Sequence, residues 1–107
     1  MKLTSVGQVI ATRAIRMQGS SDTAFIVKIG LPCQFPDSTD YYCPIQITTK
    51  SGESNAVRYA AGIDAVQALQ LAMKAVGAIL YSLNEEAGGK LRWDGDEEGD
   101  LGFPFPT

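Results

Sequence analysis

A run of acidic residues near the C-terminal end of the sequence could bind a metal cation. It extends from Asp94 to Asp100 and holds five carboxylates and two glycines. Carboxylates fall on positions 1, 3 and 5 of a calcium loop that starts at Asp94, and a glycine falls on position 6. Position 12, which needs a bidentate glutamate, is Phe105. We therefore expect no metal site, and interpret the run as a solvated acidic loop or as an electrostatic contact for a basic partner.

Two cysteines, Cys33 and Cys43, are the other candidates for metal binding or nucleophilic catalysis. Zinc normally takes four nitrogen or sulfur ligands, and the chain has no histidine to complete such a set. Without histidine, a Ser-His-Asp or Cys-His arrangement is impossible within this chain. We therefore expect structural or incidental thiols, no catalytic residue and no cofactor. An enzyme would need a cofactor or a second chain to do what histidine does elsewhere.

Three large aromatic residues, Trp93, Phe103 and Phe105, flank the acidic run. Exposed aromatic residues between prolines can anchor a protein partner. The alternative is that they fold back onto the sheet or the helix, because burial of each side chain is worth about 1.5–3 kcal/mol. The interaction surface that we predict combines these aromatic residues with carboxylates of the acidic run: Trp93, Asp96, Glu97, Glu98, Phe103 and Phe105.

Two arginines on predicted strands, Arg13 and Arg58, offer an alternative ligand face. If they share an open sheet face with Tyr42 and Tyr59, they could bind a small ligand or single-stranded nucleic acid by charge and stacking. The chain has nine basic and twelve acidic residues, a net charge of −3, which argues against a nucleic-acid footprint. We therefore do not expect nucleic acid as a partner.

The bulk composition is that of one ordinary globular domain, with 107 residues of which 45% are hydrophobic and 20% charged. We assign the whole chain, 1–107, to a single domain with a core over 6–83 and an acidic tail containing glycine and proline over 84–107. No stretch approaches about 20 uninterrupted apolar residues. The first residues also lack the apolar segment of a signal peptide. We therefore expect a cytoplasmic protein that does not enter a membrane.

Four segments in the first half of the chain are rich in β-branched residues and alternate in polarity, which predicts strands over 6–17, 23–31, 42–49 and 55–61. Apolar residues then recur every three or four positions over 65–83, which predicts a helix. Asp64 is its expected N-cap, and Gln67 completes a pair like a capping box. Gly77 inside the helix costs about 1 kcal/mol relative to alanine unless close packing needs it.

These elements predict an α+β fold: a four-stranded antiparallel meander, one long helix packed on one face, and a C-terminal tail that wraps an edge. Residues 91–93 could add a short strand or dock on the body. One helix covers a strip of about 10 Å, whereas four strands span about 19 Å. The tail or a second copy of the chain must cover the rest, so we also expect a homodimer.

Several runs resemble a family of small bacterial proteins that is catalogued only as a domain of unknown function. The resemblance extends from about residue 9 to 104, and its most specific run is Gly-Ile-Asp-Ala-Val-Gln-Ala-Leu-Gln-Leu-Ala over 62–72. It implies a bacterial, stand-alone, cytoplasmic protein and carries no assigned activity. The shorter matching runs are Tyr42-Cys43-Pro44, Arg58-Tyr59-Ala60-Ala61, Leu91-Arg92-Trp93 and Leu101-Gly102-Phe103-Pro104.

The function that these observations favour is a non-enzymatic protein-interaction module, like an immunity protein or an adaptor. Its unidentified protein partner would contact the acidic run and the aromatic tail, and charge reversal at Asp96, Glu97 and Glu98 would weaken binding in a salt-dependent manner. The alternative is a binder of a small ligand or of single-stranded nucleic acid on the open sheet face, with Arg13 and Arg58 as anchors.

Overall fold

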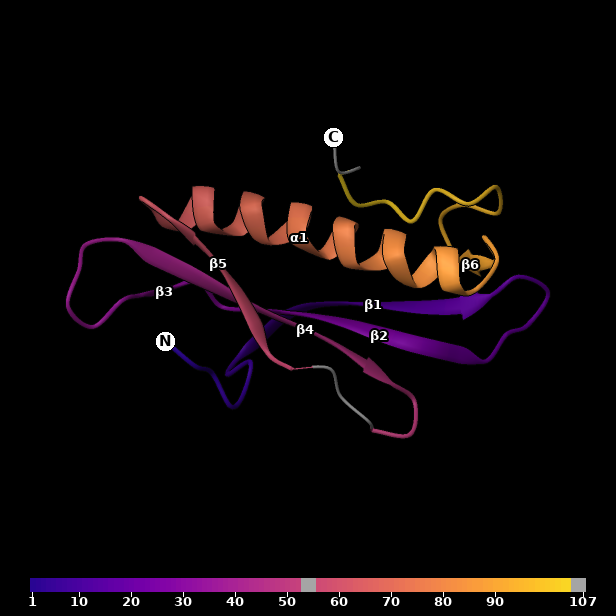
Figure 1. The fold of residues 1–107 in the computed structure, drawn as a ribbon, viewed down its shortest axis with the longest axis horizontal. Coiled ribbons are helices and arrows are strands. Elements are labelled where there is room, and N and C mark those ends of the chain that lie inside the picture. The colour runs from indigo at the N-terminus through magenta and orange to yellow at the C-terminus, as the bar shows by residue number, and fades with distance from the viewer. Residues whose placement is uncertain (53–55, 105–107) are drawn as a thin grey trace.

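An antiparallel sheet of six strands carries one long helix on one face in the computed structural model, which describes residues 1–52 and 56–104 (Figure 1). The α+β class predicted from the sequence is confirmed, but the predicted number of four strands is wrong. The two additional strands have two residues each, 33–34 and 91–92, and count as strands because their backbones pair with longer strands. The strands are β1 (Val9–Met17), β2 (Thr23–Gly30), β3 (Cys33–Gln34), β4 (Tyr41–Thr49), β5 (Arg58–Gly62) and β6 (Leu91–Arg92), and the helix is α1 (Ala65–Glu86).

The four longer strands each pair with the next along the chain, in the order β1, β2, β4 and β5. Ile45 of β4 pairs with Ile29 of β2 and with Arg58 of β5, so β2 and β5 flank opposite edges of β4. β3 continues along the edge that β2 uses. β6 returns to the far side of β1 but pairs only with Arg16 and Met17. The outer edge of β1 before these two residues has no strand beside it within the described part of the chain.

The core lies between one sheet face and α1. Alternate strand residues point to this face, and the buried ones include Ile15, Val27, Ile45 and Ile47. Helix residues four positions apart lie on the same side of α1. The buried ones, which face these strand residues, are Ala68, Ala72, Val76 and Leu80. α1 packs against β4 and β5, so the same face over β1 and β2 needs another cover.

Capping fixes the start of α1 as the sequence predicts. A carboxylate oxygen of Asp64 accepts a hydrogen bond from the backbone N–H of Gln67 at 2.8 Å. The Gln67 side chain accepts in return from the backbone N–H of Ile63 at 2.8 Å, one residue before the expected partner. The helix runs three residues past the predicted end at 83 and stops before Gly88 and Gly89, which have φ angles of 68° and 79°.

By length and composition alone, α1 would be able to cross a membrane. This is a weak indication, because the core helix of a globular domain passes the same test. In this fold the buried side of α1 belongs to the core that it shares with the sheet.

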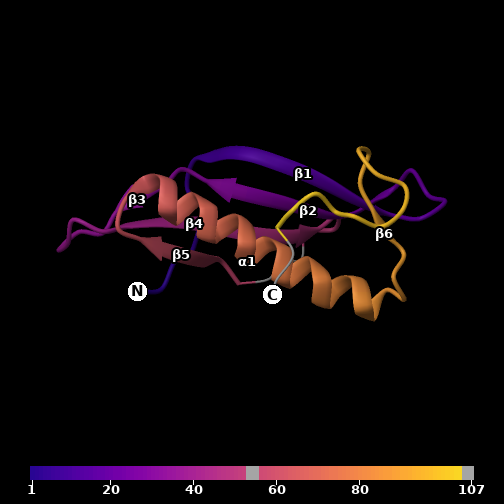
Figure 2. The ribbon, with the colours of Figure 1, turned by 90° about the horizontal axis from the view of Figure 1, so that it is seen from above.

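The C-terminal segment supplies the missing cover over β1 and β2. It leaves α1 through β6, loops outward over 94–98, and returns into the angle between β1 and α1 (Figure 2). There Leu101 and Phe103 pack against the core cluster. Gly77 marks the closest approach, because a Cβ atom at this position would overlap the backbone carbonyl of Pro104. Close packing therefore explains the glycine inside the helix.

Candidate functional site

The returning tail packs around the guanidinium group of Arg13. It projects from β1 and lies 3.7 Å from the centroid of the Trp93 ring and 5.0 Å from that of Phe103. Its Nη1 atom donates a hydrogen bond to the backbone oxygen of Leu101 at 3.0 Å. Both rings therefore make cation–π contacts with one cation. We call Arg13, Trp93, Leu101 and Phe103 the arginine clamp.

The arginine clamp joins residues that the sequence assigned to two competing sites. Trp93 and Phe103 belong to the predicted interaction surface, and Arg13 to the predicted ligand face. The structure brings them together because the tail folds back, which was the alternative expectation for the aromatic residues. Phe105, the third aromatic residue, lies outside the described residues.

Hydrogen bonds within the tail hold the returning segment in shape. The indole Nε1 of Trp93 donates to the backbone oxygen of Asp100 at 2.9 Å. The Asp100 carboxylate accepts from the backbone N–H of Gly102 at 2.8 Å. Gly102 has a φ of 80°, and a Cβ there would overlap the Arg13 guanidinium. Glycine is therefore required where the tail crosses the arginine.

Arg16 of β1 and Arg92 of β6 also hold the acidic run. Arg16 forms ion pairs with Glu97 and, at 3.6 Å, with Asp94. Arg92, which is 7% exposed, donates from Nε to the backbone oxygen of Glu97 at 2.9 Å. Part of the acidic charge is thus compensated inside the chain. Within residues 1–52 and 56–104, no group of three or more possible metal ligands gathers.

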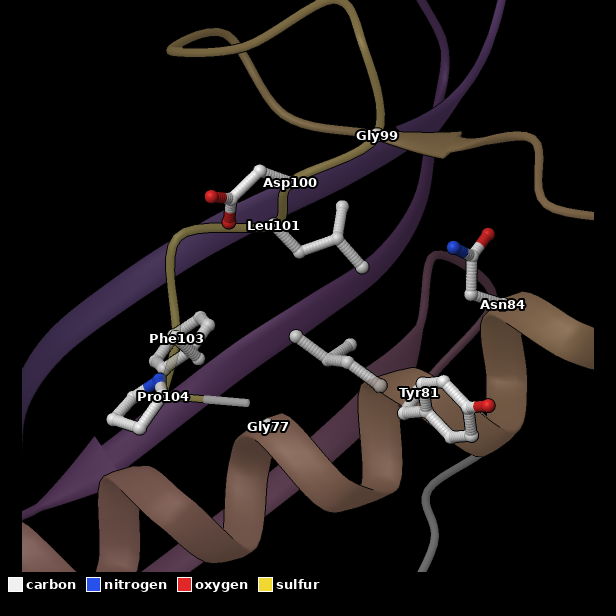
Figure 3. Close-up of a pocket in the computed structure, with 9 residues that line it drawn as sticks. Gly77, Tyr81, Asn84, Gly99, Asp100, Leu101, Phe103 and Pro104 are labelled. Carbon is white, nitrogen blue, oxygen red and sulfur yellow. The ribbon is translucent and has the colours of Figure 1, made fainter. Parts of the chain in front are cut away.

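A cavity of about 420 Å³, which we call the tail pocket, separates the C-terminal half of α1 from the tail (Figure 3). Most of its lining is apolar, and Asp100 is the only charged residue among the described residues that line it. The helix contributes Gly77, Leu80, Tyr81 and Asn84, and the tail contributes Gly99, Asp100, Leu101, Phe103 and Pro104.

Two polar side chains of α1 reach the tail pocket. The Asn84 Oδ1 accepts a hydrogen bond from the backbone N–H of Leu91 in β6 at 2.9 Å. Because the oxygen is turned to β6, the amide nitrogen is turned to the pocket (Figure 3). The second is Tyr81, whose ring lines the pocket while its hydroxyl points away from the tail (Figure 3). A hydrogen bond to Glu85 raises the pKa of this hydroxyl.

A second cavity, of about 250 Å³, lies on the other side of Phe103, between β1 and the first half of α1. We call it the edge groove. Ile10 and Ala11 of β1 form one wall, Leu69 and Met73 of α1 the other, and β2 forms the floor. It is an apolar channel that the tail leaves open.

The outer edge of β1 beside this groove is unprotected. The backbone N–H of Gln18 donates to the oxygen of Lys90 at 2.7 Å, toward β6. Alternation along β1 turns the N–H and C=O groups of Thr12 and Ala14 to the same outer side. No backbone partner faces them within the described residues. Val9 and Ile10, on the same stretch, are 40% and 44% exposed.

The two arginines of the predicted ligand face do not lie on the open face of the sheet. Arg13 pairs with Val27, and Arg58 pairs with Ile45, both of which belong to the core that α1 covers. The register therefore places both arginines on the helix side. Arg58 lies at the sheet border beside Ile79 of α1, away from the arginine clamp.

The open face holds an aromatic cluster of Tyr42 and Tyr59, which the sequence analysis names, and Phe35, which it does not. Phe35 lies 5.0 Å from Tyr42 and 5.9 Å from Tyr59, measured between ring centroids. Tyr42 and Tyr59 are 5.9 Å apart. The rings meet at angles of 51° to 75°, so they pack on each other rather than forming one flat stacking surface.

The cysteines occupy different environments. The Cys43 thiol is buried and donates to the backbone oxygen of Gly30 at 3.4 Å. Burial, and then the neighbouring Cys33, raise the pKa of Cys43 to about 11. Cys33 is half-buried in β3 and donates to the oxygen of Leu31. Both thiols are free.

A family model described as a domain of unknown function (DUF6968) matches residues 11–105, so the chain belongs to this family. No curated protein and no solved structure matches the chain. The resemblance to an uncharacterised family that the sequence showed is thereby confirmed.

Proposed function

We propose that this member of the DUF6968 family is a non-enzymatic protein-interaction module that associates through the outer edge of β1. One observation carries the proposal: the backbone groups of Thr12 and Ala14 face outward without a partner within the described residues. Unprotected, apolar strand edges readily take up another strand. The edge groove beside this strand offers further apolar surface to such a partner.

A second copy of the chain is the occupant that the edge favours. An added strand should be extended, β-branched and nearly uncharged, and β1 itself has this composition. Its outer stretch, residues 9–14, carries one charge, Arg13, which the arginine clamp already engages. Antiparallel pairing of β1 with itself about a two-fold axis satisfies both edges at once.

The position of the axis follows from charge. An axis at Arg13 would set two arginines opposite each other, which is destabilising. An axis at Thr12 instead pairs the two threonines and sets Ala11 opposite Arg13 of the partner subunit. Cross-strand threonine pairs are favourable. The proposed dimer therefore has Thr12 at its centre.

The test compares Thr12→Pro with Thr12→Ala by light scattering after gel filtration. Proline removes an outward N–H and leaves the inward bonds to β2, whereas alanine keeps the backbone intact. The proposal expects a dimer for the wild type and for T12A, and a monomer for T12P with an unchanged circular dichroism spectrum. A monomeric wild type at about 100 µM, or a T12P dimer, would contradict pairing through β1.

The acidic run is a second contact, for a partner with a basic surface. Glu98 and Asp96 have no cationic partner within the described residues, whereas Glu97 is paired with Arg16. Exposed charges of this kind steer association in a salt-dependent manner. Charge reversal at Glu98 and Asp96 should abolish capture of a partner from lysate at low salt, while T12P should not. Capture that survives both the reversal and ~0.5 M salt would exclude the acidic run as the contact.

A further inference from the structure

We infer that the tail pocket is a binding site for a small, neutral and mostly apolar molecule that carries one hydrogen-bond acceptor. The site does not involve the β1 edge, so it is independent of the proposed dimer. Its volume of about 420 Å³ lies in the range of ligand pockets, roughly 300–1,000 Å³. The side chains of Leu101 and Phe103 approach it from the tail, opposite α1 (Figure 3).

Asn84 is the reason why the ligand should carry a hydrogen-bond acceptor. Its oxygen is engaged by the backbone N–H of Leu91, so the side-chain amide cannot turn over without leaving that N–H unpaired. The NH2 group therefore stays directed to the tail pocket and offers a donor there (Figure 3). A carbonyl or similar oxygen of a ligand is its natural partner. A fixed polar group in an apolar lining is how ligand pockets set orientation.

Charge restricts the ligand further. Neither lysine nor arginine belongs to the lining that the structure describes, and the carboxylate of Asp100 is turned away from α1 (Figure 3) and accepts from the backbone N–H of Gly102. An anionic ligand would find no counter-charge in this lining. A neutral ligand has no such cost, and its apolar part can contact Leu80 and Phe103. The chemistry of the lining thus excludes phosphates and carboxylates as the preferred class.

Contacts within the chain hold the walls of the tail pocket in place. The arginine clamp fixes Leu101, and the Trp93 indole holds the backbone of Asp100. At the other end, Gly77 lets the carbonyl of Pro104 rest against α1. Binding therefore does not have to order the tail, which keeps its entropic cost low.

The experiment uses the full chain and the neutral fluorophore 6-propionyl-2-dimethylaminonaphthalene, whose carbonyl is the acceptor. Its emission is titrated, and the 15N-labelled protein is followed by NMR at the Asn84 side-chain NH2. Asn84→Asp keeps an oxygen for Leu91 but replaces the donor by an acceptor. Gln70→Glu makes the same chemical change on an exposed helix position outside the pocket. The anionic fluorophore 8-anilinonaphthalene-1-sulfonate tests the exclusion of anions.

We expect saturable binding of one molecule per chain, a shifted Asn84 NH2 resonance, and affinity that falls at least tenfold in N84D but is unchanged in Q70E. The anionic probe should bind at least tenfold more weakly than the neutral one. If N84D does not fold, Leu101→Phe, which fills the pocket, should weaken binding instead. No binding by the wild type, or equal binding by wild type, N84D and L101F, would overturn the inference.

Discussion

Replacement of Arg13 by glutamine should release the C-terminal tail from the body of the protein. The substitution removes the cation that lies 3.7 Å from the Trp93 ring and the hydrogen bond to the Leu101 oxygen. A cation–π contact is worth about 0.5–2 kcal/mol, and a hydrogen bond from a charged donor about 1.5–3 kcal/mol. Arg13 is only half-buried, so water offsets part of this sum. We expect a net loss of about 2 kcal/mol in tail docking, or roughly a 30-fold change in the ratio of docked to undocked tail.

The single tryptophan of the chain makes this loss measurable, because Trp93 belongs to the clamp itself. In the R13Q variant its fluorescence emission should shift to longer wavelength, and quenching by acrylamide should increase. Arg13→Lys should give an intermediate result, because lysine keeps the charge but loses the planar group that stacks on the rings. Arg58→Gln is the matched control, since Arg58 lies on the same sheet face but away from the tail.

An unchanged emission maximum in R13Q would refute the argument, because it would mean that the tail docks without the arginine. An equal shift in R58Q would also refute it, since the effect would then reflect general loss of charge. The assay reports tail docking separately from global unfolding, which circular dichroism follows in the same samples.

Four further predictions concern the helix and the thiols. Asp64→Ala removes the N-cap bond and should cost about 1 kcal/mol, seen as a fall of roughly 4 °C in melting temperature; an unchanged value would contradict the capping role. Gly77→Ala should fail to give the gain of about 1 kcal/mol that helix propensity offers, and should expose the tryptophan, because the new methyl group overlaps the Pro104 carbonyl; a more stable variant with unchanged emission would rule out this contact. At pH 8, a thiol reagent should modify Cys33 but not Cys43 in the native protein, and equal reactivity would disprove the burial of Cys43. Because burial raises the pKa of Cys43 from 9.0 to about 11, the folded state holds a proton that the unfolded chain releases, so stability should fall as the pH rises from about 9 to about 11 in urea titrations.

Local patterns in the sequence predict the long elements well. The alternation over 23–31 and 42–49 corresponds to β2 and β4, and the three-to-four periodicity corresponds to α1. The predicted helix end at 83 is too early, because the apolar repeat stops at Leu83 while polar residues on the exposed side continue the helix to Glu86. Apolar periodicity marks only the buried side of a helix, so it does not show how far the exposed side continues.

The short strands and the site depend on contacts that local patterns do not carry. β3 and β6 have two residues each and exist only because β4 and β1 lie beside them. The partners of Arg13 lie about 80 and 90 positions further along the chain, so neither spacing nor composition indicates them. The expectation that the tail covers part of the sheet came from geometry rather than from a motif, and it identified the right segment without its contacts.

The pairing of β6 with β1 joins the first strand of the domain to the last. During synthesis, the strands from β1 to β5 and α1 leave the ribosome before Leu91 and Arg92 do, and can begin to associate first. Until the tail follows, the apolar face over β1 and β2 and the whole outer edge of β1 stay uncovered. The newly made chain therefore passes through a stage in which it exposes more apolar surface and more unpaired strand edge than the folded protein does. The acidic charge of the tail follows the other elements of the domain, and its pairing with Arg16 ends this stage.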